Sequence, residues 1–201
     1  MKFDSKITPR FFKAVFGKTS TDNYHPIIAD PSTCGLLTSE HNDIAVHEGH
    51  YFRSGLNYTL ANGNVAGFGM SIPNAGKEIH MSWEFTATAN GVFTLKEDVT
   101  SFAGGATVTP LNHNRVKAST NPSITTCIKG MTGVSPITPT GGTTILNAIL
   151  STARGSSINR DTSAELILKP SSNYFWQYTN GTSANVIQLI LTWHDHIPCV
   201  S

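Results

Sequence analysis

Charged residues are scarce in this chain. Only 13% of its 201 residues are Asp, Glu, Lys or Arg, and the formal net charge is +1, whereas a typical soluble domain has about 25% charged residues. A chain this close to neutral is not expected to hold nucleic acid by bulk electrostatics. Ser, Thr, Asn and Gly replace the charges, and a neutral polar surface suits packing against other protein, because amides and hydroxyls need only hydrogen bonds when they are buried.

Cysteines and long apolar runs are also few. The three cysteines, Cys34, Cys127 and Cys199, are widely spaced and form no Cys-x-x-Cys pair, which argues against a disulfide framework or a zinc knuckle. No stretch approaches the roughly 18 apolar residues of a membrane helix, so no membrane partner is expected. Charges interrupt every apolar run near the N-terminus, so the sequence predicts no signal peptide and synthesis inside the cell.

The first 30 residues are basic and aromatic, and they end near two X-Pro steps that disfavour helix. We interpret residues 1–30 as an N-terminal arm. One alternative is a frayed, solvated terminus. The other is an arm that orders on a neighbouring subunit, because its aromatic side chains are costly to leave in water. The arm residues expected to make such contacts are Lys6, Arg10, Phe11, Phe12 and Phe16.

Apolar residues beyond the arm recur at every second position, which is typical of half-buried strands. The clearest runs are 52–60, 79–85 and 174–178, while 187–193 is apolar enough on both faces to lie centrally in a sheet. Strand candidates arrive about every ten residues with turn residues between them, so residues 31–201 are predicted to form one all-β domain. Long connections favour a jelly-roll-like antiparallel β-sandwich. Only 143–152 is considered for a short helix.

The sequence offers no recognisable catalytic set. A Ser/His/Asp triad would need a nucleophile elbow, which is missing, and the few carboxylates lie where no raised pKa is expected. Trp83, Trp176 and Trp193 fall on the apolar side of alternating strands, so a core role is expected for all three rather than carbohydrate binding. We therefore predict a protein without catalytic residues or cofactor.

Two histidine clusters keep a metal-binding alternative open. His47 and His50 are three residues apart, which places them on opposite faces of a strand. His194 and His196 share a face, and with Asp195 they resemble the metal ligands at the mouth of a cupin. A solvated strand end is the preferred interpretation of residues 194–196, so no metal site is predicted. A cupin-like site built from the four histidines is the alternative.

The loop Asn112, His113, Asn114 and Arg115 has more hydrogen-bonding groups than a turn requires. One interpretation is an Asx-type turn that satisfies its own backbone. The other is an intersubunit contact, for which the planar guanidinium of Arg115 is well suited because it holds several donors in one geometry.

Three segments together resemble a widespread group of tailed-bacteriophage virion proteins. The segments are 45–52 (Ala-Val-His-Glu-Gly-His-Tyr-Phe), 104–115, which ends in Thr-Pro-Leu-Asn-His-Asn-Arg, and 165–170 (Glu-Leu-Ile-Leu-Lys-Pro). These segments are similar to three patterns that the group carries in the same order: His-Glu-Ile-His-x-Gly, Thr-Pro-x-Asn-Arg-Asn-Arg and Glu-x-Ile-Leu-Lys-Pro. The resemblance covers about residues 41–193 and excludes the arm. His113 replaces the usual Arg, and Ala45-Val46 replaces Glu-Ile.

The resemblance implies a non-enzymatic virion protein. Its expected role is that of a capsid cement or decoration subunit that bridges major capsid protein subunits on the outside of an icosahedral head, assembled in the host cytoplasm. The implied partners are the major capsid protein and further copies of the chain, as a homotrimer. The alternative that the resemblance leaves open is a fibre or tail component that binds a receptor or a glycan.

Overall fold

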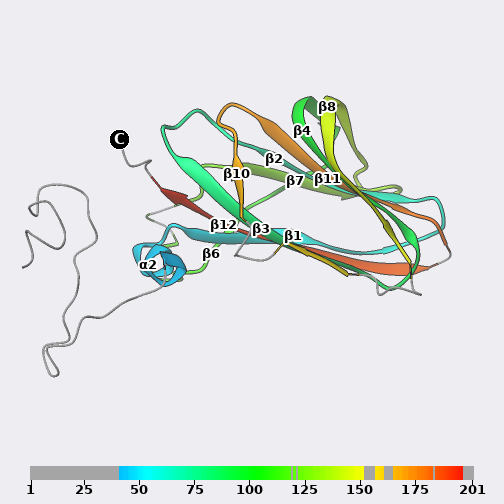
Figure 1. Ribbon diagram of the computed structural model, residues 1–201, viewed down its shortest axis with the longest axis horizontal. Coiled ribbons are helices and arrows are strands. Elements are labelled where there is room, and N and C mark those ends of the chain that lie inside the picture. Colours follow the sequence, from blue (N-terminus) through cyan, green and yellow to red (C-terminus); the bar gives the residue numbers. More distant parts are fainter. Residues whose placement is uncertain are drawn as a thin grey trace, which may run out of the picture. The chain divides into compact units, whose positions relative to one another are not determined.

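The alternating apolar residues form strands, and the strands form two antiparallel sheets that pack face to face (Figure 1). The computed structural model describes residues 41–118, 120, 122–151, 157–160, 165–182 and 184–196. The all-β sandwich expected from the sequence is therefore confirmed. The residues of the predicted arm lie outside the described residues, so the boundary expected at residue 30 stays a prediction.

One helix and twelve strands are found within the described residues. Their bounds are α2 His41–Glu48, β1 Tyr51–Leu60, β2 Val65–Ser71, β3 Glu78–Ala87, β4 Gly91–Gly104, β5 Ala106–Val108, β6 Leu111–Asn112, β7 Thr126–Met131, β8 Ile137–Leu150, β9 Ser157–Arg160, β10 Leu166–Leu168, β11 Asn173–Asn180 and β12 Asn185–His196. Among the described residues, no helix has the length and apolar character needed to span a bilayer.

The two sheets are built from nested antiparallel pairs. The first sheet has the order β10-β3-β12-β1-β6, with β9 also paired to β3, and the second has the order β5-β7-β2-β11-β4-β8. Thus β1 pairs with β12, β2 with β11, β3 with β10 and β4 with β8. As predicted, β12 lies in the middle of its sheet.

The core fills the space between the sheets. Inward side chains of both sheets form one large apolar cluster, which includes the three tryptophans, each less than 5% exposed. This confirms the core role predicted for Trp83, Trp176 and Trp193. The inward set predicted for 52–60 and 79–85 is confirmed at its large apolar positions, since Phe52, Leu56 and Leu60 are buried in β1 and Ile79, Met81, Trp83 and Phe85 are buried in β3. Ser82 of β3 is buried as well.

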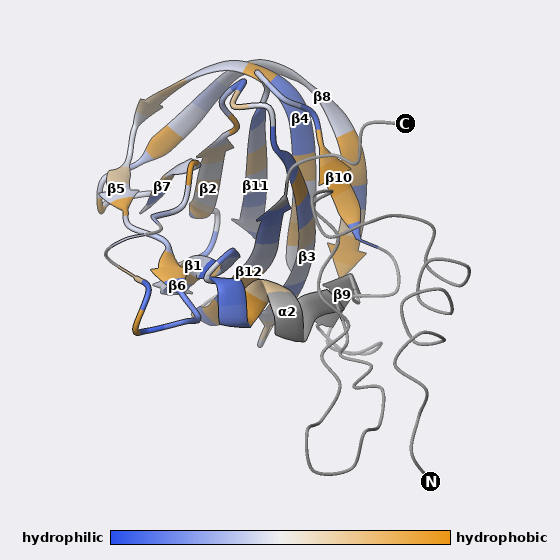
Figure 2. Ribbon diagram, turned by 90° about the vertical axis from the view of Figure 1, so that its left-hand side faces the viewer, coloured by the Kyte–Doolittle hydropathy of each residue, from blue (hydrophilic) through white to orange (hydrophobic). Residues whose placement is uncertain are grey.

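A second, smaller apolar cluster lies on the outer face of the second sheet. Phe175 alternates with the core residues of β11 and so points away from them, yet it is fully buried against Val99 and Ile137. The β4–β8 hairpin bends at two register shifts, and β4 and β8 run side by side as they bend in Figure 2. Gly67 of β2 leaves room for this cluster, because a Cβ there would lie 2.4 Å from Cζ of Phe175.

Two local expectations were wrong. Residues 143–150 belong to strand β8 rather than to a helix, since their Thr and Ile side chains are β-branched and pair with β4. Conversely, the helix α2 was not foreseen at 41–48. It ends at Glu48, and the next residue, Gly49, has a φ of 79°, which is the left-handed conformation that commonly terminates helices.

Candidate functional site

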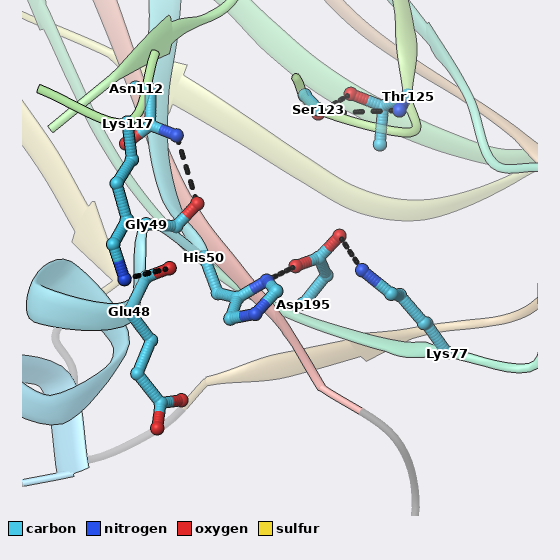
Figure 3. Close-up of polar contacts among 9 residues, drawn as sticks. All are labelled: Glu48, Gly49, His50, Lys77, Asn112, Lys117, Ser123, Thr125 and Asp195. Atoms are coloured by element: carbon cyan, nitrogen blue, oxygen red, sulfur yellow. Dashed lines mark hydrogen bonds and ion pairs between the residues drawn. The ribbon is translucent and has the colours of Figure 1, made fainter. Parts of the chain in front are cut away.

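The amide-rich loop binds the C-terminal end of α2 (Figure 3). Asn112 donates from Nδ2 to the carbonyl of Gly49 at 2.8 Å. Asn114 donates from Nδ2 to the carbonyl of His47 at 2.9 Å. Lys117 Nζ lies 3.5 Å from the carbonyl of Glu48. Carbonyls at a helix C-terminus lack partners within the helix and carry partial negative charge. These loop side chains therefore cap α2.

The loop also contains the Asx-type turns considered in the sequence analysis. The backbone N–H of Asn114 donates to Oδ1 of Asn112, and that of Val116 donates to Oδ1 of Asn114. Asn112 is buried by these contacts, whereas His113 and Arg115 are exposed. His113 packs edge-on against the ring of Tyr51, and its pKa is lowered by partial desolvation of the imidazole and by the nearby Arg53.

Within the described part of the chain, the tip of this loop is exposed. His113, Arg115 and Val116, which is 91% exposed, form that tip. The intersubunit role of residues 112–115 stays a prediction, as does that of Lys6, Arg10, Phe11, Phe12 and Phe16, which lie outside the described residues.

A buried carboxylate lies at the end of the sandwich where α2 meets β1. Asp195 is 2% exposed, and it accepts from His50 Nδ1 at 2.9 Å and from Lys77 Nζ at 3.1 Å (Figure 3). A buried carboxylate is costly unless it is paired, and here the ammonium of Lys77 supplies the compensating charge. The cluster ties β1, β12 and the segment before β3 together.

Three further ionisable side chains meet on the outer face of the first sheet. His80 and His194 are directly opposite each other on β3 and β12, and their rings stack with centroids 4.9 Å apart. Glu165, immediately before β10, lies beside both: its carboxylate is 3.2 Å from His80 Nδ1 and 4.0 Å from His194 Nδ1. On the far side of His80, Glu78 lies 3.7 Å from Nε2.

The structure corrects the interpretation of the histidines. His194 and Asp195 are each 2% exposed, so residues 194–195 are not a solvated strand end. The cupin-like grouping does not form as proposed, because His50 pairs with Asp195 while His194 points to the opposite face and meets His80. His47 is exposed at the end of α2. His80 and Glu165 were not considered as ligands from the sequence.

A charged network joins the two sheets near β10. Lys169 Nζ donates to Glu97 Oε1 at 2.6 Å and to Asp98 Oδ2 at 3.1 Å. Tyr174 donates its hydroxyl hydrogen to Glu97, and burial raises the pKa of Tyr174. Hydrogen bonds from Ser172 and Lys169 lower the pKa of Asp98. This network positions the turn after Pro170.

The longest exposed feature is strand β8, which is at the edge of the second sheet among the described strands. Its 14 residues include no charged side chain, and most are exposed. Ile145 and Ile149 are 43% and 83% exposed, and Ile149 lies opposite the partly exposed Val92 of β4. Among the described strands, an apolar strip therefore accompanies a sheet edge whose pairing with β4 is interrupted by two register shifts.

Comparison with models of known families, with characterised proteins and with solved structures gave no significant match. Function is therefore inferred from the surface of the described chain. The two features that bear on it most are the β8 edge and the tip of the loop that caps α2.

Proposed function

We propose that this chain is a non-enzymatic virion structural protein, a cement or decoration subunit on the outside of an icosahedral phage head. In this role it bridges neighbouring major capsid protein subunits and contacts copies of itself, as a trimer. Closed symmetry is the usual way in which identical subunits meet.

The observation that carries the proposal is the β8 edge. An edge strand presents a row of backbone N–H and C=O groups, and natural proteins usually protect long edges with charges, prolines or covering segments. β8 has 14 residues and only one proline, Pro139. An edge of this kind is suited to a partner that adds a strand or covers the strip, and Ile145 and Ile149 would be buried in that contact.

We also infer that the sandwich is a jelly roll. In that arrangement a long antiparallel hairpin is rolled up, so the first strand pairs with the last, the second with the second to last, and so on inward. The pairs β1–β12, β2–β11, β3–β10 and β4–β8 follow this nesting, with β5, β6 and β7 inserted before β8. Jelly rolls are frequent in viral capsid proteins, which supports the proposal.

The three motifs that carry the resemblance serve the scaffold in the described chain. In the second motif, Asn112 and Asn114 cap α2, which contains His47 and Glu48 of the first motif. In the third motif, Glu165 lies beside His80 and Lys169 pairs with Glu97. These contacts give the motif residues a role in the scaffold of the described chain, while the resemblance itself rests on the three sequence motifs.

Deletion of the arm tests the proposed role. A variant lacking residues 1–20 should keep the β-sheet circular dichroism spectrum and the thermal transition of the full chain, because residues 41–201 form a compact unit by themselves. It should lose binding to purified capsids that lack the protein, measured by co-sedimentation. A variant with Lys6 and Arg10 replaced by Gln removes two charges of the arm and keeps its aromatic side chains, so its capsid binding shows how much the charges contribute. Normal decoration of the capsids by the truncated chain would refute the role of the arm.

A further inference from the structure

We propose that His80, Glu165 and His194 form a binding site for a divalent transition-metal ion, with Zn²⁺ as the best-matched ion. This site is separate from the β8 edge and from the tip of the α2-capping loop. It also differs from the four-histidine grouping considered from the sequence.

The donor set has the right chemistry. Two imidazole nitrogens and one carboxylate are the protein ligands of many zinc sites, in which a fourth position is left for water or another ligand. One potential ligand atom from each of His80, Glu165 and His194 lies within 4.8 Å of the others. Acid-only clusters favour Mg²⁺ or Ca²⁺, whereas a set with two imidazoles favours zinc and its neighbours.

Two of the three ligands, His80 and His194, lie in paired strands, and Glu165 immediately precedes a third paired strand. His80 and His194 are cross-strand partners on β3 and β12, and Ile167 of β10 is paired with His80. Glu165 is two residues before Ile167, so the strand period places it on the same face as the imidazoles. Sites built on strands are more precisely positioned than sites on loops. The register therefore brings all three residues to one place on the sheet.

The surroundings suit a metal site. Glu78 lies 3.7 Å from Nε2 of His80, so a small movement of its side chain would let the carboxylate accept from the second nitrogen of a metal-binding histidine. His194 is 2% exposed and stacks near Tyr51, whereas His80 and Glu165 are 20% and 22% exposed. One side of the cluster is thus protected by protein, and the other is open to an entering ion.

Binding requires a modest rearrangement. Ligand atoms around tetrahedral zinc lie about 3.3 Å apart, given metal–ligand distances of about 2.0–2.1 Å, and the widest pair here is more distant than that. Glu165 is the side chain best able to move, because it precedes β10 and is partly exposed. The stacked imidazoles must also turn so that one nitrogen of each points toward the ion.

The direct test is Zn²⁺ binding by the full chain. Protein treated with a chelator and dialysed should take up one Zn²⁺ per chain in isothermal titration calorimetry, and Co²⁺ in its place should give the intense visible absorption of a tetrahedral site. Glu165→Gln and His80→Gln should each weaken Zn²⁺ binding at least tenfold. Glu78→Gln should weaken it less, because Glu78 acts through His80.

Two control variants test whether Zn²⁺ binds at the proposed site and not at other histidines. His47→Gln removes an exposed histidine and His50→Gln disrupts the Asp195 cluster, and both should bind Zn²⁺ as the unmodified chain does.

Zn²⁺ should also raise the melting temperature of the unmodified chain but not that of Glu165→Gln, whose circular dichroism spectrum reports its folding. Affinity should fall under acidic conditions, because protons compete with the metal ion for the imidazole nitrogens. A lack of stoichiometric uptake, or uptake unchanged by Glu165→Gln and His80→Gln, would overturn the proposal.

Discussion

Two buried asparagines organise the turns at one end of the sandwich. Asn185, which is fully buried, accepts from the backbone N–H groups of Thr88 and Ala89 and donates to Tyr178 and Asn180. Asn180 in turn donates to the carbonyls of Leu60 and Ala61. Amide side chains thus link three turns at a place where backbone groups would otherwise be buried without partners.

Asn185→Ala should therefore be strongly destabilising. The substitution removes a side chain that satisfies several buried groups, and we expect the free energy of unfolding to fall by about 2–4 kcal/mol. Urea denaturation followed by tryptophan fluorescence measures the change. Gln188→Ala, at an exposed position of the same strand, is the matched control and should stay within about 0.5 kcal/mol of the unmodified chain. Equal effects of the two substitutions would contradict the bonding described for Asn185.

Asp98 provides a prediction about acid stability. Its pKa is lowered in the folded chain by hydrogen bonds from Ser172 and Lys169. A lowered pKa means that the carboxylate stabilises the fold above its unfolded pKa, near 3.9, and that this contribution is lost as pH falls through the folded pKa. Asp98→Asn should thus lower stability at neutral pH and flatten the decline in stability between about pH 5 and pH 2.

The Asn substitution isolates the charge. Asp98 has a φ of 57°, and Asn tolerates this left-handed conformation. Urea midpoints at pH 7 and pH 3 give the measurement. Glu84→Gln, which removes an exposed carboxylate from β3, should change the acid decline less. A steeper decline in Asp98→Asn than in the unmodified chain would show that the assigned contacts do not hold Asp98 ionised.

At the scale of elements, the packing of the bent β4–β8 hairpin depends on two glycines of β2, Gly67 and Gly69, which have no side chains. Phe175 and Ile137 occupy the space above Gly67, and Phe102 lies above Gly69. The hairpin can therefore pack on the outer face of its own sheet, where it buries Val99 and Phe175. This packing fixes the direction in which the exposed half of β8 extends.

Gly67→Ala should loosen this packing. The added Cβ would meet the ring of Phe175 at 2.4 Å, and overpacking of this kind costs about 1–3 kcal/mol of stability. Gly181→Ala is the matched control, because the nearest atom to its Cβ is 3.4 Å away. Thermal denaturation of both variants provides the comparison. Equal melting temperatures would contradict the role assigned to the glycines of β2.

The elements also show what could be predicted from the sequence. Apolar residues on both faces identified β12 as a central strand. Period-two alternation identified β1, β3 and β11, because the apolar side chains on one face of each strand form the core. It could not identify β8 equally well, because an edge strand with little buried surface lacks that alternation. The helix α2 was missed because its apolar residues follow no clear helical stripe; its C-terminus is fixed by Asn112 and Asn114, which are distant in sequence.

The candidate metal cluster illustrates the same limit. Alternation placed His80 on the outer face of its strand, and that placement is confirmed. Its proximity to His194 and Glu165 depends on strand register across β10, β3 and β12, and register between strands more than 80 residues apart cannot be derived from spacing alone. The sequence analysis expected His194 and Asp195 to be solvated, and they are buried because strands distant in sequence pack around them.

For the molecule as a whole, the account predicts that β8 is an assembly surface. Ile149→Lys places a charge on the exposed edge strip, where lysine is a common protection against pairing. The variant should keep the stability of the unmodified chain within about 0.5 kcal/mol, because Ile149 is 83% exposed, and it should bind capsids and other copies of the chain more weakly. Gln188→Lys adds the same charge on the other sheet and should leave assembly unchanged. Equal binding by both lysine variants would exclude β8 as the contact.

The central claim is that the chain works as a structural part of a virion, and electron cryomicroscopy of purified particles from the source of this sequence tests it most directly. The account predicts density for the β-sandwich on the capsid exterior, in a fixed number of copies, with the β8 edge against a neighbouring subunit. Particles whose every surface density is accounted for by other proteins, with this chain recovered only as a free protein from the cell, would contradict it.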